Sequence, residues 1–355
     1  MRFARIFALF IVTTFFTGTL AGCTAATNEP FTADAGAIMR QIALENNYLA
    51  RIHTLQPTSR NPRNPNQPAI NEAIGTGILF RNTDGELRIA TVNHVLGPTP
   101  DTATIWVTFG SGFGKAEIVG RDPAADLALL KVPAWLTEGV EPARFNFSND
   151  LQVGDTVFAT GFPFGMENTT FGFITALKER ELEDPFPQWL YVTTQAPVNS
   201  GNSGGPLLNR NREVVAINES IISTTAGSGM AFSVTAYALG RLLPRLERGG
   251  VVEHVQLDFS VRETRDVSPI FYEYYTGKNY PPPEEGVMVY EVFATTSRAS
   301  FVRPGDLVKE IRFGEKVHVV TTRQAFEEFI FFEVSPNTRG ELVLKRGSEL
   351  LIFQL

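Results

Sequence analysis

Short apolar runs at near-regular spacing are the feature that most limits the fold of this chain. Between Gly75 and Val234 the runs alternate with turns rich in glycine, aspartate and asparagine, and little of this stretch has helical periodicity. Many short strands joined by turns are typical of antiparallel barrels and sandwiches. The sequence therefore predicts a mainly β protein with two packed antiparallel β-barrels. The expected strands are Ile78–Phe80, Leu87–Val92, Ala103–Phe109, Ala116–Val119, Leu127–Val132, Thr156–Thr160, Thr170–Ala176, Leu190–Thr194 and Val214–Ile217.

One stretch within this region, Gly201–Leu207 (Gly-Asn-Ser-Gly-Gly-Pro-Leu), presents a serine between glycines. Glycines permit a tight loop and a close approach of another backbone. The Ser203 hydroxyl is then placed to attack a carbonyl carbon, and the amides of Gly201 and Ser203 to bind the oxyanion that forms. Such a serine needs a base, and His94 and Asp126, each beside an apolar run, supply one.

Each of these three residues also has a structural explanation. A histidine after a strand is often a hydrogen-bonded core residue, an Asp-Leu-Ala sequence often begins a strand, and a serine often caps a turn. Their occurrence together, in the order His94, Asp126, Ser203, favours catalysis.

The contexts Thr91-x-x-His94, Asp126-Leu-Ala and Gly201–Leu207 together resemble the HtrA family of trypsin-like serine proteases, from about Asn47 to Leu355. The resemblance implies a trypsin-like double β-barrel and a His94, Asp126, Ser203 triad, with Gly201 and Ser203 as the oxyanion hole. It also implies an ATP-independent serine endopeptidase without a cofactor, which works as a homotrimer on unfolded or mislocalised exported polypeptides.

The same resemblance assigns the primary specificity pocket to Met230, Ala231 and Phe232. No acidic residue is present there to receive a basic side chain, so we expect a preference for small or medium apolar side chains. The alternative is that these three residues belong only to the core. Ser200 and Asn93 depart from the family pattern beside the serine and the histidine, but neither change removes a catalytic group.

The segment Ala236–Leu246 has one apolar face and is followed by Gly249 and Gly250, which predicts a helix at a domain boundary. We therefore expect a protease domain over residues 36–248 and a second domain over residues 249–355. The second domain resembles a PDZ-like α+β domain.

The PDZ resemblance implies binding of C-terminal peptide ligands by strand addition. It places the carboxylate-binding loop at Leu257, Asp258 and Phe259. Asp258 occupies the usual glycine position, and its charge would repel a carboxylate. Use of this domain only for packing or assembly therefore stays open.

Residues 1–22 have the charges and apolar run of a secretory signal. They end in Leu-Ala-Gly before Cys23, which resembles a lipoprotein signal. The resemblance implies lipidation of Cys23 and a tether over residues 23–35. The protein would then be periplasmic and held at a membrane, which would be the outer membrane if the source has two. An ordinary secretory signal or a membrane helix is the alternative.

Two further segments are expected before the first catalytic motif. A short helix over Ala37–Glu45 serves either a trimer contact or its own domain, and Pro57–Asn71 is expected to be a surface loop.

Composition excludes some function classes. The net charge of −7 gives no basic surface for nucleic acid. The four histidines are scattered without the spacing of a metal site, and no phosphate-binding loop is present, so neither a metal nor a nucleotide is expected. Two alternatives to general proteolysis remain: a proteolytically silent envelope adaptor and a regulatory protease with one partner.

Overall fold

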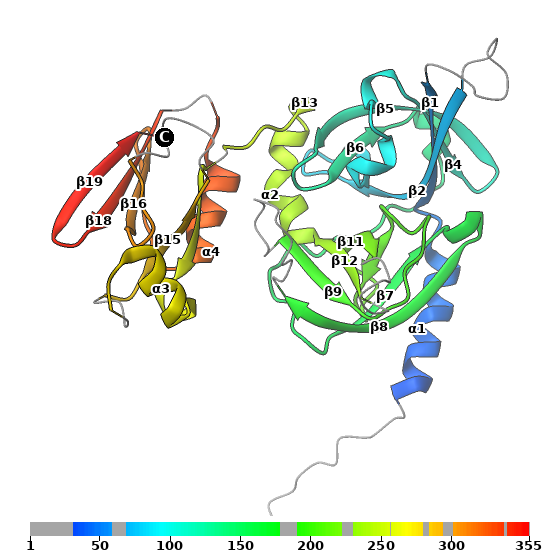
Figure 1. Cartoon of the computed structure of the whole chain (residues 1–355). Helices are drawn as coiled ribbons and strands as arrows, with labels where there is room; N and C mark the ends of the chain where they lie inside the picture. Colours follow the sequence, from blue (N-terminus) through cyan, green and yellow to red (C-terminus); the bar gives the residue numbers. More distant parts are fainter. Residues whose placement is uncertain are drawn as a thin grey trace, which may run out of the picture.

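The computed structural model describes residues 31–58, 69–177, 190–221, 230–255, 257–279, 284–293, 301–336 and 339–354. A helix leads into two β-barrels, and a smaller sheet with its own helices follows (Figure 1). The predicted mainly β fold with two antiparallel barrels is confirmed.

The first barrel has the strand order β5-β4-β1-β2-β3-β6 and is closed by pairing of β5 with β6; β13 adds to it in parallel beside β5. Its strands are β1 (Leu49–Thr58), β2 (Ala69–Arg81), β3 (Leu87–Thr91), β4 (Thr104–Phe109), β5 (Gly112–Asp122), β6 (Leu127–Lys131) and β13 (Gly250–Val251). Apolar side chains such as Ile52, Ile78 and Leu129 fill its interior.

The second barrel is closed in the order β10-β11-β12-β9-β8-β7. Its strands are β7 (Thr156–Gly161), β8 (Asn168–Leu177), β9 (Tyr191–Thr194), β10 (Pro206–Leu208), β11 (Val214–Ile221) and β12 (Ala231–Thr235). The pairing of β11 with β12 is bulged, because Asn218 and Ser220 face successive residues of β12 and Glu219 is left as the extra residue. Such bulges re-aim a side chain, often next to an active site.

The expected loop over Pro57–Asn71 is shorter in the structure. Strand β1 continues through Pro57, which pairs with Ile70 of β2. Proline is tolerated there because β4 pairs with β1 only from Arg51 to Leu55, so one edge of β1 beyond Leu55 has no strand that needs an amide. Residues 59–68 lie outside the described part of the chain.

Helix α1 (Phe31–Glu45) begins before Ala37, within the segment for which the sequence predicts a tether. Ile38 and Ile42 are buried in an apolar cluster that includes residues of both barrels, α1 contacts β8, and Asp34 pairs with Arg210 in the turn after β10. These contacts hold α1 against its own domain. They explain why the helix also includes residues before Ala37, which the sequence assigns to a tether.

Helix α2 (Ala236–Leu246) is the amphipathic helix that the sequence predicts. The Thr235 side chain accepts a hydrogen bond from the amide of Ala238 (3.2 Å) and caps its N-terminus. Leu239 and Leu242 are fully buried on its apolar face. The apolar face that the sequence predicts is therefore the face that packs, although Pro244 lies within the helix.

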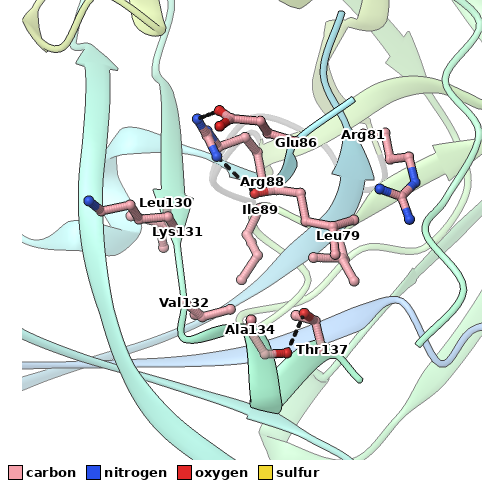
Figure 2. A pocket seen from close by; sticks show the side chains of 11 residues that line it. Leu79, Arg81, Glu86, Arg88, Ile89, Leu130, Lys131, Val132, Ala134 and Thr137 are labelled. Carbon is pink, nitrogen blue, oxygen red and sulfur yellow. Dashed lines mark hydrogen bonds and ion pairs between the residues drawn. The ribbon is translucent and has the colours of Figure 1, made fainter. Parts of the chain in front are cut away.

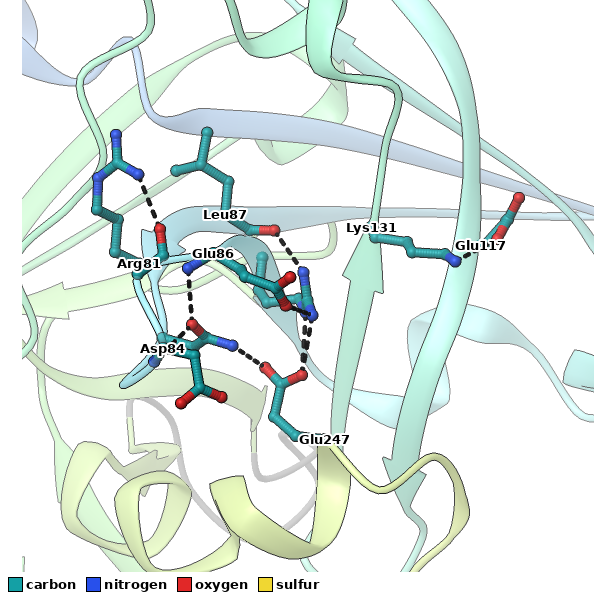
Figure 3. Close-up of polar contacts among 10 residues, drawn as sticks. Arg81, Asp84, Glu86, Leu87, Glu117, Lys131 and Glu247 are labelled. Carbon is teal, nitrogen blue, oxygen red and sulfur yellow. Dashed lines mark hydrogen bonds and ion pairs between the residues drawn. The ribbon is translucent and has the colours of Figure 1, made fainter.

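The C-terminal end of α2 is fastened to the first barrel by Glu247. Its carboxylate accepts hydrogen bonds from Asn82 Nδ2 (2.8 Å) and Arg88 Nε (3.1 Å), as Figure 3 shows. Both side chains of the Arg88 and Glu247 pair are mostly buried. The chain thus leaves α2 at a fixed point and enters β13.

The second domain has the sheet order β14-β15-β16-β18-β19, with β17 paired to β16. Its elements are β14 (Phe259–Glu263), α3 (Pro269–Thr276), β15 (Val287–Val292), β16 (Leu307–Phe313), β17 (Lys316–Val319), α4 (Arg323–Glu328), the π-helical turn η8 (Phe329–Glu333), β18 (Gly340–Arg346) and β19 (Glu349–Gln354). Strand β14 forms an edge of the sheet and contacts α4.

The boundary between the two domains lies after β13. Strand β13 still pairs with the first barrel, and the sheet of the second domain begins with β14. The aromatic side chains of Phe331 and Phe332, although they come from η8, are buried in the same apolar cluster as the first barrel and α2. Phe332 packs edge-on against Tyr237 of α2, with ring centroids 6.3 Å apart. The second domain is therefore joined to the first through η8.

Candidate active site

His94 and Asp126 are held together at the first barrel. His94 lies in the turn η1 (Asn93–Leu96) directly after β3, and Asp126 ends the turn between β5 and β6. The Asp126 carboxylate accepts from the His94 amide (2.8 Å) and lies 2.6 Å from His94 Nδ1. Nδ1 therefore carries a proton, and Nε2 is left as the basic nitrogen of the neutral ring.

Asp126 has a strained backbone. Its φ of 51° lies in the left-handed region, which costs a residue with a side chain about 1 kcal/mol or more. The Asp126 carbonyl also accepts from the amide of Asn93 (3.0 Å). Strain of this kind persists only where neighbouring contacts define the geometry, and it is frequent at functional sites.

The electrostatic surroundings of His94 favour its cation. Partial burial acts to lower the pKa of His94, but the hydrogen bond to Asp126 and the negative charges of Asp126 and Glu219 outweigh burial, so the pKa is raised above its usual value. The imidazolium that forms when a base takes a proton from serine is stabilised by the same groups.

Ser203 comes from the second barrel, in the turn before β10, and is half-buried. Thr76 of β2 ties this turn to the first barrel: its amide donates to the Ser203 carbonyl (2.8 Å), and its hydroxyl donates to the Gly201 carbonyl (2.7 Å). These two hydrogen bonds hold the serine loop against the first barrel, which carries His94 and Asp126.

Gly201 occupies a backbone conformation that other residues avoid. Its φ is +103°, and a Cβ atom at this position would lie 2.4 Å from the Phe162 carbonyl oxygen. Only glycine fits this loop without movement of the backbone.

The amides predicted to form the oxyanion hole have no other partner in the described part of the chain. The Asn202, Gly204 and Gly205 amides donate to the carbonyls of Asn199, Asn218 and Asn202 respectively. Those of Gly201 and Ser203 donate to no acceptor within the described residues, so both are available to a ligand.

The Ser203 hydroxyl differs from the expected arrangement. It donates to the backbone carbonyl of Glu219 (3.0 Å) and, with one proton to donate, does not engage His94. The Ser203 hydroxyl must leave the Glu219 carbonyl before His94 can take this proton. Glu219 is the extra residue of the β11 bulge, is 7% exposed, and carries no motif in the sequence that would single it out.

The residues expected to form the specificity pocket lie at the start of β12. Ala231 and Phe232 are buried and pair with Thr194 and Thr193 of β9, whereas Met230 is 46% exposed. Residues 222–229, which precede them, lie outside the described part of the chain. The predicted apolar preference therefore stays a prediction.

In the second domain, Leu257 and Asp258 precede the edge strand β14, and Phe259 begins it. The Asp258 carbonyl accepts from the amide of Phe293 (2.7 Å), which fixes the start of the strand beside β15. The side chain of Phe259 is buried in the core of this domain. Cys23 and the signal segment lie outside the described residues.

A cavity of about 380 Å³ lies away from the triad, on the outer side of β2, β3 and β6 (Figure 2). Leu79, Ile89 and Leu130 provide apolar walls, and Arg81 and Lys131 are at its rim. In the described residues, no group of three or more histidine, cysteine, aspartate or glutamate side chains is placed to hold a metal ion.

The fold and this site define a trypsin-like peptidase domain, and residues 75–217 match the family described as "Trypsin-like peptidase domain". The chain is 31% identical over 250 residues to a probable periplasmic serine protease do/HhoA-like from Haemophilus influenzae, covering 69% of this chain and 50% of that protein. It is 36% identical over 200 residues to a probable periplasmic serine endoprotease DegP-like from Chlamydia pneumoniae, covering 54% and 38% of the two chains.

The fold is also similar to that of an HtrA-type protease, AlgW, solved with a decapeptide. The TM-score is 0.65 at 22% identity, over 89% of this chain and 97% of that one. The chain spans about half the length of the relative from Haemophilus influenzae (50%) and less of the chlamydial one (38%). None of the helices in the described residues combines the length and the apolar character needed to cross a membrane.

Proposed function

We propose that the chain is an exported, ATP-independent serine endopeptidase that cleaves unfolded or mislocalised proteins of the cell envelope. The single observation that carries this proposal is the pairing of His94 Nδ1 with Asp126 Oδ2 at 2.6 Å, opposite a serine loop with two unused amides. The printed names of the relatives, periplasmic serine proteases, support the same reaction and compartment.

The reaction follows from the arrangement of these groups. Ser203 rotates from the Glu219 carbonyl, His94 Nε2 takes its proton, and Oγ bonds to the peptide carbonyl carbon while the amides of Gly201 and Ser203 bind the oxyanion. His94 then gives the proton to the leaving amine as the C–N bond breaks. A water molecule repeats these steps on the acyl-enzyme and releases the acid.

The test uses the full chain and its Ser203→Ala variant, each incubated with an unfolded protein and, separately, with an organophosphorus label for active serines. We expect cleavage and labelling by the full chain and neither by the variant. Cleavage that persists in Ser203→Ala, in the absence of contaminating protease, would contradict the proposal.

The Ser203 hydroxyl bonded to Glu219 favours one alternative, a proteolytically silent adaptor. An adaptor would bind polypeptides but leave Ser203 unlabelled at every peptide concentration. A regulatory protease would instead be labelled and cleave one protein out of an envelope extract, which distinguishes it from general quality control.

We further propose that the second domain is PDZ-like and binds C-terminal peptides along the free edge of β14. The edge position of β14 beside α4 supports this proposal. Binding of a fluorescent peptide with an apolar C-terminus tests it.

We also propose that three copies of the chain assemble and that Cys23 carries the membrane anchor. The mass of the purified protein in solution tests the assembly. Membrane fractionation of a Cys23→Ser variant tests the anchor.

A further inference from the structure

A buried contact between a carboxylate and an imidazole links the second domain to the turn that carries Asp126. Asp122, the last residue of β5, is fully buried, and His254, three residues after β13, has a side chain that is 6% exposed. His254 Nε2 lies 2.7 Å from Asp122 Oδ2. Neither residue belongs to the catalytic machinery described above.

Asp122 holds the turn that precedes Asp126. Its Oδ1 accepts hydrogen bonds from the amides of Ala124 and Ala125, each at 3.0 Å. These bonds fix the chain up to the residue before Asp126, which then adopts its strained φ of 51°. The carboxylate of Asp122 thus holds the turn that leads directly into Asp126.

His254 is held from the opposite side by η8. Its ring stacks on the ring of Phe331, with centroids 3.8 Å apart and an interplanar angle of 14°, and its Nδ1 lies 3.1 Å from the Phe331 carbonyl oxygen. Arg245 Nη1 donates to the same carbonyl (2.9 Å).

The hydrogen-bond partners of this histidine come from both domains. The Phe331 carbonyl lies at Nδ1 and the Asp122 carboxylate at Nε2. His254 therefore bridges the two domains. The Arg245 guanidinium at the end of α2 interacts electrostatically with Asp122 and with Arg248.

The connection continues into the second domain. Phe331 belongs to η8, which extends α4, the helix that contacts the edge strand β14. Arg241 Nη2 of α2 donates to Glu333 Oε1 (2.9 Å) at the other end of η8. Edge strand β14, α4, η8 and the ring of His254 therefore form one continuous series of contacts. A π-helical turn at this place agrees with the frequent occurrence of such turns at functional sites.

We propose that Asp122 and His254 are positioning residues of the protease: His254, clamped by Phe331, orients Asp122, and Asp122 fixes the turn that presents Asp126 to His94. The proposal rests on the proposed function for its kinetic readout. It makes the docking of η8 a determinant of the catalytic rate, although no atom of η8 belongs to the triad.

The first experiment compares His254→Gln and Asp122→Asn with the full chain on a short peptide substrate. We expect kcat to fall about 10- to 100-fold in both, because small displacements of a catalytic group have effects of that size, with KM nearly unchanged. The double variant should lose no more than the worse single variant, because the two residues act as one unit.

A pH profile separates positioning from general loss of structure. The hydrogen bond to Asp126 raises the pKa of His94, together with the charges of Asp126 and Glu219, against the lowering effect of burial. If Asp126 is displaced, that support weakens, so the acid limb of kcat/KM should move to lower pH in His254→Gln. A merely structural role would lower the melting temperature and leave this limb in place.

The control is His53→Gln, a histidine on β1 paired with Glu72 and outside the interface, which should match the full chain. Should Asp122→Asn fail to fold, His254→Gln and Phe331→Leu, which removes the stacking ring but keeps an apolar side chain in the cluster, carry the test. Unchanged kcat and an unchanged acid limb in a folded His254→Gln variant would overturn the proposal.

A readout without turnover distinguishes this proposal from the proposed function. The proton between His94 Nδ1 and Asp126 gives a low-field NMR resonance, which should shift in His254→Gln and stay in place in His53→Gln. If the full chain cleaves nothing, the proposed function fails, yet a shift of this resonance would still support the positioning role. A resonance that is identical in all variants would refute that role.

Discussion

At the scale of single residues, the site depends on charges and backbone angles as much as on the triad itself. Glu219 is buried in the β11 bulge, its carbonyl receives the Ser203 hydroxyl, and its charge raises the pKa of His94. Gly201 holds a φ that brings its backbone against Phe162. Each feature leads to a measurable prediction.

Replacing Glu219 by glutamine should move the acid limb of the kcat/KM profile to lower pH. The substitution removes a negative charge that favours the His94 cation, so the pKa of His94 falls and the neutral base persists in more acidic solution. Glu349→Gln, an exposed carboxylate of the second domain, is the matched control and should leave the limb unchanged. A limb that moves to higher pH would contradict this account.

Gly201→Ala should reduce kcat by about 10²- to 10³-fold, the effect of losing one oxyanion donor. The new methyl group would lie 2.4 Å from the Phe162 carbonyl oxygen, so the loop must move. Gly139→Ala is the control, because Gly139 also has a positive φ of 75° but a methyl group added there would meet no atom within 4 Å. Equal activity of the two variants would show that the close contact at Gly201 does not shape the oxyanion hole.

At the scale of elements, helix α2 contacts the barrels and leads into the segment that connects the two domains. Its apolar face is buried, and Glu247 fastens its end to Asn82 and Arg88 of the first barrel. Another ion pair in the same view, Lys131 with Glu117, joins two side chains that are mostly exposed (Figure 3). The two pairs allow buried and exposed charges to be compared within one barrel.

Glu247→Gln should lower the free energy of unfolding by about 1–3 kcal/mol, because a mostly buried Arg88 loses the more buried of its two carboxylate partners and keeps only the exposed Glu86. Glu117→Gln should change it by about 0–1 kcal/mol, since the Lys131 and Glu117 side chains are 53% and 73% exposed and screened by water. Urea titration of both variants measures the difference. A larger loss in Glu117→Gln would contradict the assignment of α2 as the anchored element.

At the scale of the whole molecule, the two domains share apolar contacts through η8. Phe332 packs against Tyr237, and the Arg241 guanidinium lies 4.5 Å from the centre of the Phe332 ring. A side chain of the second domain thus contributes to the core of the first. Unfolding of the two domains should be coupled for this reason.

Calorimetry of the full chain should show one main transition, and Phe332→Ala should separate it into two. Removal of a buried phenylalanine costs about 3–5 kcal/mol, here taken from the contact between the domains. Phe353→Ala, on the last strand of the second domain, should destabilise that domain without splitting the transition in the same way. Two transitions already present in the full chain would contradict the coupling.

The barrels could be predicted from the sequence alone because short apolar runs alternate with turns. This pattern depends on neighbouring residues only, and the strands pair in the structure where the pattern places them. The residues His94, Asp126 and Ser203 could be singled out for a similar reason, since each lies in a short motif of its own. The loop over Pro57–Asn71 was predicted too long, because proline reads as a strand breaker unless it is known that β4 stops pairing at Leu55.

What only the tertiary structure decided are the contacts between distant segments. No local pattern marks Glu219 as the residue that receives the Ser203 hydroxyl, because its place depends on a bulge between β11 and β12. The partnership of Asp122 with His254 joins residues 132 positions apart, and neither has a motif around it. Sequence determines which groups are present and their local geometry, whereas burial and hydrogen-bond partners across the chain depend on the packed fold.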